Sequence, residues 1–340
     1  MFLQTDVALT GINFNRDSIK LALDAVNGAV KKIDLMMFKF DYKPLADALI
    51  AAHTRGVTIR AIIDARSLTF CMPDTDVNVP DYLVCHGIET YIYNDVPNIL
   101  HCKFILVDDY AVITGSQNFF QNDILHDYEM LMRLEGKVNA PFYSNISNYF
   151  DSVLRDERTT VHKCEHKKIF QDEKNDFVHE TKIISQPFSV HVEQLFFSPE
   201  TDAKSMVLET IKRATERIIV TEAFFFEAPD VANALIDSLK KGVEVKVLTN
   251  LFRNRTTFYR YLQNNGINMA MYCLDNSLMH HKTILIDNNI VFTGSLNLFP
   301  RSLNFDREFA VLIESEKLNK ILDEQFQVIC NDSYAMKFCH

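Results

Sequence analysis

Apolar side chains recur with helical spacing near the start of the chain. Within residues 18–32 they line one face of a helix, at Ile19, Leu21, Ala22, Ala25, Val26, Ala29 and Val30. Residues 45–54 return to the same spacing, and Gly56 follows as a helix stop signal. The pattern therefore predicts two amphipathic helices in this region.

Short apolar runs, too brief for helices, lie between and after these segments. They cover residues 33–40, 57–63, 88–93, 102–107 and 111–114, and their composition is typical of buried strands. Asp108-Asp109 marks a turn between the last two runs. Helices that alternate with buried strands indicate a mixed sheet with helices on both faces.

The same order begins again near Val192. Residues 23–33 match 208–218 at an offset of 185, and residues 46–50 match 232–236 at an offset of 186. From Gly87 and Gly266 onward the offset stays at 179. Segments that agree in order, with one small insertion, indicate a duplication. We therefore expect an α/β fold of two tandem duplicated lobes, each a mixed β-sheet flanked by helices.

The predicted lobes cover residues 1–151 and 189–340, and a charged linker covers 152–188. Residues 152–182 contain seven acidic residues, seven basic residues and three histidines, without clear apolar periodicity. This composition is typical of a solvated connection. His162, Cys164 and His166 lie there without a fourth ligand in a recognisable zinc pattern, so we favour a linker over a metal site.

The best-matched stretch of the two copies is also rich in polar side chains. The first copy has His101, Lys103, Asp108, Gly115-Ser116, Asn118 and Glu129, and the second has His280, Lys282, Asp287, Gly294-Ser295, Asn297 and Glu308. The spacings within the two sets are identical. Duplicated folds keep apolar positions easily, but polar positions kept in register require a chemical cause.

A phosphoryl group suits these residue types. A histidine and a lysine two positions apart on a strand point to the same face. Histidine, lysine and asparagine together give a cationic, donor-rich site for the charge on phosphoryl oxygens. One histidine would attack phosphorus, the other would protonate the leaving oxygen, and Glu129 and Glu308 would each orient one imidazole. Such a site needs no metal and no other cofactor.

Four further motif residues are expected to support this chemistry rather than perform it. Asp108 lies an odd number of residues from His101, so its side chain points away from that face or lies in the hairpin turn. The same holds for its counterpart, Asp287. Ser116 and Ser295 follow glycines that leave room for a ligand oxygen close to backbone N–H groups.

His-x-Lys-x4-Asp followed by Gly-Ser-x-Asn, twice in one chain, resembles the phospholipase D superfamily. The pair Arg301-Ser302 with Glu308 is similar to the corresponding stretch of cardiolipin synthases. The resemblance implies a phosphodiesterase that works through a covalent phosphohistidine at the lobe interface. It implies His101 as nucleophile and His280 as general acid, although the residues alone leave the two roles interchangeable. Two residues before each motif glutamate, where many members of the superfamily have asparagine, this chain has Asp127 and Asp306.

Members of this superfamily act on phospholipids or on nucleic acids, and the sequence leaves both substrate classes open. Arg253, Arg255 and Arg260 follow the strand expected at 243–248, among aromatic residues, and could bind nucleic acid; Arg301 joins them as a candidate substrate-binding residue. The 26 phenylalanines, the apolar loop at 68–72 and the acidic balance favour phospholipid. We expect a phospholipid phosphodiesterase or transphosphatidylase, with a metal-independent endonuclease as the alternative and an inactive phosphoryl-binding module less favoured. Phe224 and Phe226 are interpreted as core. Phe120 and Phe299 follow the motif asparagines and could flank the mouth of the site, but core is favoured for them as well.

Composition narrows the class of protein further. Hydrophobic residues make up 47% and charged residues 24%, so disorder is excluded as the main state. The net charge of −10 requires any polyanion to bind through a local patch. Apolar runs are too short for a membrane span, and the start lacks a signal-peptide layout. Seven cysteines without a Cys-x-x-Cys pair suggest free thiols in a reducing compartment, and hence a cytoplasmic protein. An enzyme of this kind that acts on lipids would dock peripherally on membranes. Both motifs lie in one chain, so a monomer suffices for a complete site.

Overall fold

The computed structural model describes residues 2–138, 140–164, 186–273, 277–332 and 335–337. The chain forms two compact units. The N-terminal unit comprises Ala8–Leu125 and Met130–Phe188, and the C-terminal unit comprises Ser189–His340 with Met1–Val7 and His126–Glu129. The short segment 126–129 therefore leaves its neighbours in sequence and belongs to the C-terminal unit.

The N-terminal unit has a mixed sheet with three adjacent parallel strands. Its strand order is β1 (Phe2–Phe14), β7 (Met130–Glu135), β6 (Ala111–Gly115), β5 (Lys103–Val107), β2 (Lys32–Met37), β3 (Thr58–Asp64), β4 (Glu89–Tyr93) and β8 (Thr159–Val161). Strands β2, β3 and β4 are parallel to one another, and the other pairs are antiparallel. Parallel strands need crossover helices, which the α/β pattern supplies.

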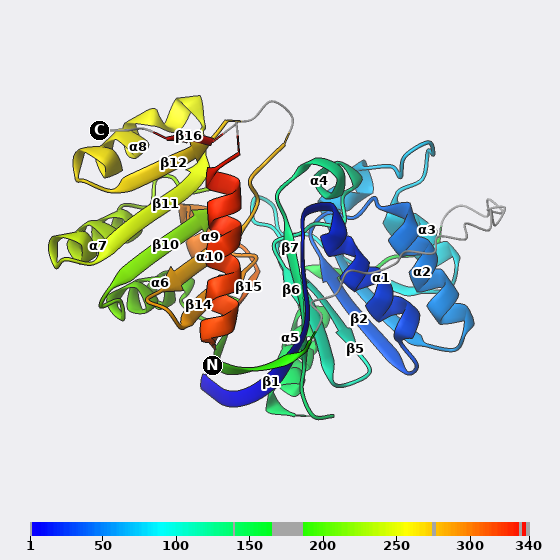
Figure 1. The fold of residues 1–340 in the computed structure, drawn as a ribbon. Helices are drawn as coiled ribbons and strands as arrows, with labels where there is room; N and C mark the ends of the chain where they lie inside the picture. The colour runs from blue at the N-terminus through cyan, green and yellow to red at the C-terminus, as the bar shows by residue number, and fades with distance from the viewer. Residues whose placement is uncertain (1, 139, 165–185, 274–276, 333–334, 338–340) are drawn as a thin grey trace. The chain divides into compact units, whose positions relative to one another are not determined.

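Helices cover both faces of this sheet (Figure 1). They are η1 (Asn15–Asp17), α1 (Ser18–Gly28), α2 (Lys43–Thr54), η2 (Ala65–Thr69), α3 (Val79–Cys85), α4 (Gln121–His126) and α5 (Pro141–Leu154). Side chains alternate along β2, so Ile33 and Leu35 pack with α1 and α2 in one core. Asp34 points the other way, where Arg60 pairs with it at 2.7 Å and with Asp151 of α5 at 3.0 Å.

The C-terminal unit repeats this topology strand for strand. Its order is β9 (Phe188–Ser198), β15 (Glu308–Glu314), β14 (Ile290–Gly294), β13 (Lys282–Ile286), β10 (Arg217–Glu222), β11 (Glu244–Asn250), β12 (Asn268–Tyr272) and β16 (Ala335–Lys337). Strands β10, β11 and β12 are again parallel. Each strand therefore has a counterpart at the same place in the other sheet, which confirms the predicted duplicated α/β fold.

Its helices also lie on both faces of the sheet. They are α6 (Ala203–Lys212), α7 (Pro229–Lys240), η3 (Arg253–Arg255), α8 (Thr256–Asn264), α9 (Pro300–Asn304) and α10 (Glu316–Cys330). Ile218 and Val220 of β10 pack in one core with α6 and α7. Arg217, at the start of the same strand, reaches Asp323 of α10 at 2.6 Å. Burial on both faces explains the continuous apolar runs of the central strands.

Part of the segment expected to be a linker belongs to the N-terminal sheet. Helix α5 ends at Leu154, and β8 then pairs antiparallel with β4. Strand β8 is the counterpart of β16, which pairs with β12 in the other unit. Residues 165–185 lie outside the described residues, so a charged linker there stays a prediction.

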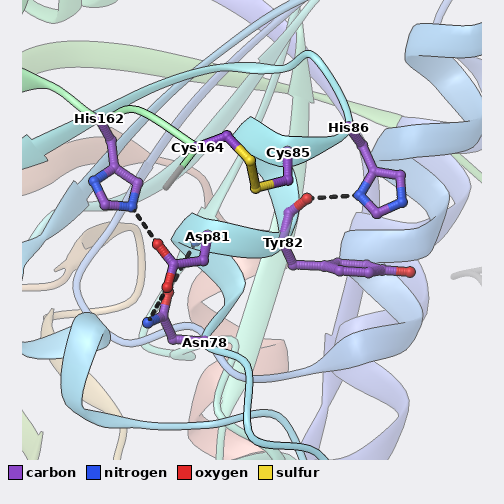
Figure 2. The surroundings of a disulfide bond; sticks show 7 residues. All are labelled: Asn78, Asp81, Tyr82, Cys85, His86, His162 and Cys164. Carbon is purple, nitrogen blue, oxygen red and sulfur yellow. Dashed lines mark hydrogen bonds and ion pairs between the residues drawn. A yellow bond between two sulfur atoms is a disulfide. The ribbon is translucent and has the colours of Figure 1, made fainter. Parts of the chain in front are cut away.

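A disulfide fixes the chain just after β8 (Figure 2). Cys164 is bonded to Cys85 at the end of α3. Nearby, His162 contacts the Asp81 carboxylate at 2.6 Å, and Asn78 caps α3 by accepting from the Asp81 N–H at 2.9 Å. The expectation of free thiols is therefore wrong for Cys85 and Cys164, because their bond forms only once distant segments meet. The inference of a reducing compartment loses this support.

A helix can cross a membrane only if it is long enough and apolar enough. Among the described residues, every helix falls short of the length and apolar character that crossing a bilayer requires.

Candidate active site

Each motif histidine comes just before a central strand of its unit. His101 precedes β5 and His280 precedes β13, and both side chains are buried. Lys103 Nζ donates to the His101 carbonyl at 2.7 Å, and Lys282 Nζ donates to the His280 carbonyl at 2.9 Å. The lysine amines thus turn back along the strand toward the histidines, as two-residue spacing predicts. Both units use the same geometry.

The motif glycines are required by a neighbouring strand. A Cβ on Gly115 would lie 2.1 Å from the Met130 carbonyl oxygen, and one on Gly294 would lie 2.2 Å from that of Phe309. Any side chain at these positions would push the strands apart. We expected the glycines to leave room for a ligand oxygen, but the structure shows that they let β7 and β15 approach.

The motif serines hold the strands that carry the motif glutamates. Ser116 exchanges hydrogen bonds with the Met130 backbone, next to Glu129. Ser295 does the same with Phe309, next to Glu308. Each serine therefore fixes the backbone beside one glutamate.

Glu129 and His280 come from different motif copies and meet in the C-terminal unit. The His280 Nδ1 and Glu129 Oε1 atoms are 2.7 Å apart, and the carboxylate is fully buried. The backbone of 126–129 is held beside this histidine, because Tyr128 N–H donates to Leu278 and His280 N–H donates to Tyr128. A carboxylate can only accept, so Nδ1 carries the proton, and Nε2 is the ring nitrogen left for acid–base chemistry.

Glu308 is held by two hydroxyl groups. Ser295 Oγ donates to it at 2.6 Å and Ser302 Oγ at 2.5 Å. Ser302 Oγ also accepts from the Asn297 N–H at 2.9 Å. Serine at 302 therefore links the motif asparagine to the motif glutamate, which gives the similarity at Arg301-Ser302 a structural meaning.

The two motif asparagines share an unusual feature. Both side chains are 3% exposed, and the amide oxygens of Asn118 and Asn297 have no hydrogen-bond partner among the described residues. Asn118 Nδ2 donates to Asp123 at 3.0 Å. A buried polar atom without a partner costs free energy, so equivalent unpaired ends in both copies are typical of groups that await a ligand.

The motif aspartates lie in turns and bind backbone. Asp108 follows β5, and its carboxylate accepts from the N–H groups of Val30, Lys31 and Lys32. Asp287 follows β13 and binds residues 215–217 in the same way, and these N–H groups and the Thr215 hydroxyl lower its pKa despite partial burial. Both aspartates therefore tie the motif hairpin to the strand beside it.

Two of the candidate substrate-binding arginines form ion pairs with carboxylates, and the other two are exposed. Arg255 pairs with Glu227 and lies 4.6 Å from the centre of the Phe226 ring. Arg301 pairs with Asp306 at 3.1 Å and lies 5.8 Å from the centre of the Phe299 ring. Arg253 and Arg260 are exposed on η3 and α8. Asp127, the other departure from the family asparagine, accepts from the Leu278 N–H at 2.7 Å.

Two positioning residues escaped the sequence analysis. Asp64 accepts from the Leu100 N–H at 2.9 Å, and Asn250 accepts from the Met279 N–H at 3.0 Å. Each therefore holds the residue just before a motif histidine. Their separation equals the offset of 186 already found nearby, and this signal could have found them.

A buried glutamate also lies beside one motif lysine. Glu222 is the register partner of Lys282, whereas the register partner of Lys103 is Met37. Burial raises the pKa of Glu222 well above its ordinary value, although Lys282 opposes the shift. His281 is also buried, and desolvation with the nearby charge of Lys282 lowers its pKa to about 3. The surroundings of the C-terminal motif therefore hold a neutral imidazole and an acid that resists ionisation.

Comparison with known proteins places these motifs in a family. The family model for the cardiolipin synthase, PLD-like domain matches residues 22–154 and 207–330. Cardiolipin synthase A of Proteus mirabilis is 23% identical over 88% of this chain and 64% of its own length, and that of Serratia proteamaculans is 24% identical over 80% and 58%. The chain thus spans about three fifths of these relatives.

A solved structure shares the fold. The phosphatidylserine synthase of Haemophilus influenzae Rd KW20 superposes with a TM-score of 0.71 at 12% identity, over 98% of this chain and 90% of that one. At this identity the likeness concerns the fold alone. The family match covers most of both units and contains both sets of motif residues. The chain therefore belongs to the family of cardiolipin synthase PLD-like domains.

Proposed function

We propose that this protein is a phospholipase D-type enzyme that cleaves a phospholipid phosphodiester and passes the phosphatidyl group to water or an alcohol. The hydrogen bond between Glu129 and His280 carries this proposal. It joins a glutamate of the first motif to a histidine of the second within the C-terminal unit, so residues of both motif copies act on one imidazole. Family membership and the synthase names of the relatives favour transfer to an alcohol.

The proposed reaction has two steps, in which a bond from phosphorus to His101 forms and then breaks. His101 Nε2 attacks phosphorus and the bond to the leaving oxygen breaks, while His280 Nε2 gives that oxygen a proton. His280, now neutral, then takes a proton from water or an alcohol, whose oxygen attacks phosphorus and releases His101. Glu129 orients His280 throughout and stabilises its protonated form.

The remaining motif residues would stabilise charge on the phosphoryl oxygens. The buried lysines Lys103 and Lys282 supply positive charge. The Nδ2 groups of Asn118 and Asn297 supply donors, and that of Asn118 would exchange Asp123 for a phosphoryl oxygen. This donor set needs no metal, and peripheral docking would bring the lipid to it. Asp108, Asp287, Ser116 and Ser295 would keep the scaffold in place.

One assay tests the reaction and the substrate class together. The full chain is mixed with phosphatidylglycerol vesicles, single-stranded DNA or double-stranded DNA, all with chelator present. Head-group release or transfer is expected from vesicles. Cleavage of DNA without head-group release would instead establish the nuclease alternative, and a steep loss of cleavage with added salt would accompany it. Loss of activity in chelator would contradict a metal-free reaction.

Acid-sensitive labelling separates the two histidines. With a lipid labelled in its phosphatidyl group, His101→Ala is expected to abolish both turnover and covalent labelling. His280→Ala is expected to lose turnover but to retain labelling when the head group is a good leaving group. His53→Ala, a change on α2 away from both motifs, serves as the control. Labelling of the His101→Ala protein would reverse the two roles.

A further inference from the structure

Four phenylalanines gather beside His280 in the C-terminal unit. Phe224 and Phe226 follow β10, Phe252 follows β11, and Phe299 follows the motif asparagine. We call them the aromatic cluster. Phe224 meets the His280 ring edge-on, with ring centres 6.1 Å apart. The cluster therefore begins where the reacting phosphoryl group would lie.

The rings of the aromatic cluster stack on one another. Phe224 and Phe252 stack with centres 5.3 Å apart and planes at 13°, and Phe226 and Phe299 stack at 5.3 Å and 18°. The two pairs also touch, with 6.5 Å between Phe224 and Phe299 and 6.1 Å between Phe226 and Phe252. The four rings thus form one continuous apolar surface.

This surface is incompletely buried, although its residues are strongly apolar. All four members of the aromatic cluster are half-buried, whereas Phe225, between two of them, is fully buried. The expectation that Phe224 and Phe226 belong to the core is therefore wrong for their outer parts, and the half-burial of Phe299 agrees with the alternative that it flanks the site. Leaving several phenylalanines partly in water forgoes burial energy, which is typical of a surface that binds an apolar ligand.

The charges around the aromatic cluster favour a lipid over a nucleic acid. The guanidinium groups of Arg255 and Arg301 lie over its rings, but each is paired with a carboxylate, from Glu227 and Asp306. Paired charges attract a polyphosphate backbone weakly. The ring faces are also partly covered by each other and by Arg255, so bases find little open face for stacking. Hydrocarbon needs only apolar area.

The N-terminal unit provides an internal contrast. There, Phe38 meets the His101 ring edge-on at 5.1 Å, but the Lys39 ammonium lies 5.3–5.7 Å from the rings of Phe38, Phe70 and Phe120. The matching bridges of Phe40 with Phe119 and of Phe225 with Leu298 make Phe224, a member of the aromatic cluster, the counterpart of Lys39. The N-terminal rings therefore surround a cation, whereas the aromatic cluster does not have one at that place.

We propose that the aromatic cluster binds the acyl chains of the phospholipid whose phosphodiester reacts beside His280. The proposal rests on the proposed function, because it names the part of that substrate which these residues hold. It assigns Phe252 and Phe299 a role in substrate selectivity and leaves the chemistry to the motif residues.

Tryptophan fluorescence tests binding without turnover, because the chain has no tryptophan of its own. Phe252→Trp is titrated with dihexanoyl phosphatidylglycerol below its micelle concentration, and with glycerophosphoglycerol, the same diester without acyl chains. A blue shift is expected with the acylated ligand and not with the deacylated one. Tyr261→Trp, at an exposed aromatic position on α8, is expected to show no shift. Equal responses of Phe252→Trp to both ligands would overturn the proposal.

Kinetics supply a second readout. The ratio of kcat/KM for the acylated over the deacylated diester is expected to fall about tenfold in Phe252→Ala, mainly through KM. Phe252→Leu should retain most of the ratio, because it keeps apolar area without an aromatic face. An unchanged ratio in folded Phe252→Ala would contradict the acyl assignment. Failure of the proposed function looks different, since the unmodified chain would then release no head group from either diester.

Discussion

The two motif copies share their backbone supports and differ in the side chains around them. In both units the motif lysine donates to the histidine carbonyl, the aspartate ties the hairpin, and the serine clamps the glutamate strand. The C-terminal unit has Glu222, Asn250 and Asn264 at the three positions that differ. At the equivalent positions the N-terminal unit has Met37, Asp64 and the disulfide-bonded Cys85. Duplication thus kept the geometry of the motif while its electrostatic surroundings diverged.

Removing the carboxylate of Glu129 should have the largest effect on activity. Glu129→Gln presents an amide that can turn its donor end toward His280 and favour the wrong tautomer, so kcat is expected to fall about 10⁴-fold with little change in stability. Phosphodiesterase kinetics and thermal unfolding together measure this. Glu135→Gln, at the far end of β7, is the matched control. A loss below tenfold would contradict the orienting role.

Opening the disulfide tests the difference at Cys85. The bond closes a sequence separation of 79 residues, so Cys85→Ser should lower the free energy of unfolding by about 4 kcal/mol in the chain-entropy account. Urea unfolding of Cys85→Ser, Cys164→Ser and the double variant should give the same loss, and reductant should give it in the unmodified chain. Cys71→Ser changes an exposed thiol and should leave stability unchanged. Unequal single variants would argue against the bond as the cause.

Exchanging Asp64 and Asn250 tests how each unit holds its histidine. The Asn250 amide donates to the carbonyls of Ala223 and Met279, both at 2.8 Å, which a carboxylate cannot do. Asn250→Asp should therefore cost about 2 kcal/mol of stability. Asp64→Asn should cost less, because an amide oxygen can still accept from Leu100, and the ion pair that it loses, with Arg66 at 3.0 Å, involves a guanidinium that is partly in water. Chemical denaturation of both variants measures the two costs, and equal losses would contradict this asymmetry.

The smallest expected effect is on the pH dependence of stability and comes from Glu222. Burial raises its native pKa, so the native protein keeps the proton to higher pH than the unfolded chain. Stability is therefore lost as pH rises from the ordinary glutamate range through the raised pKa, by at most about 1.4 kcal/mol per pH unit. Glu222→Met, which copies Met37, should flatten this slope in denaturation series across pH. Glu216→Met, at an exposed site, should keep it.

Local sequence determined much of the fold and the identity of the motif residues. The spacing of apolar residues reflects the period of each helix and strand, and the repeat offsets fixed the equivalence of the two sheets. The polar spacing placed each lysine on the same strand face as its histidine. The periods and the polar spacing depend on neighbours within a few residues, and the repeat shows when the sequence is compared with itself, so a single sequence carries all of these features.

Only the tertiary structure decided which distant residues meet. The pairing of Glu129 with His280, separated by 151 residues, depends on the segment 126–129 joining the C-terminal unit. The bond between Cys85 and Cys164 and the half-burial of the aromatic cluster likewise arise from long-range packing. Side-chain spacing repeats with the local backbone period, whereas contacts across many residues depend on how whole elements pack.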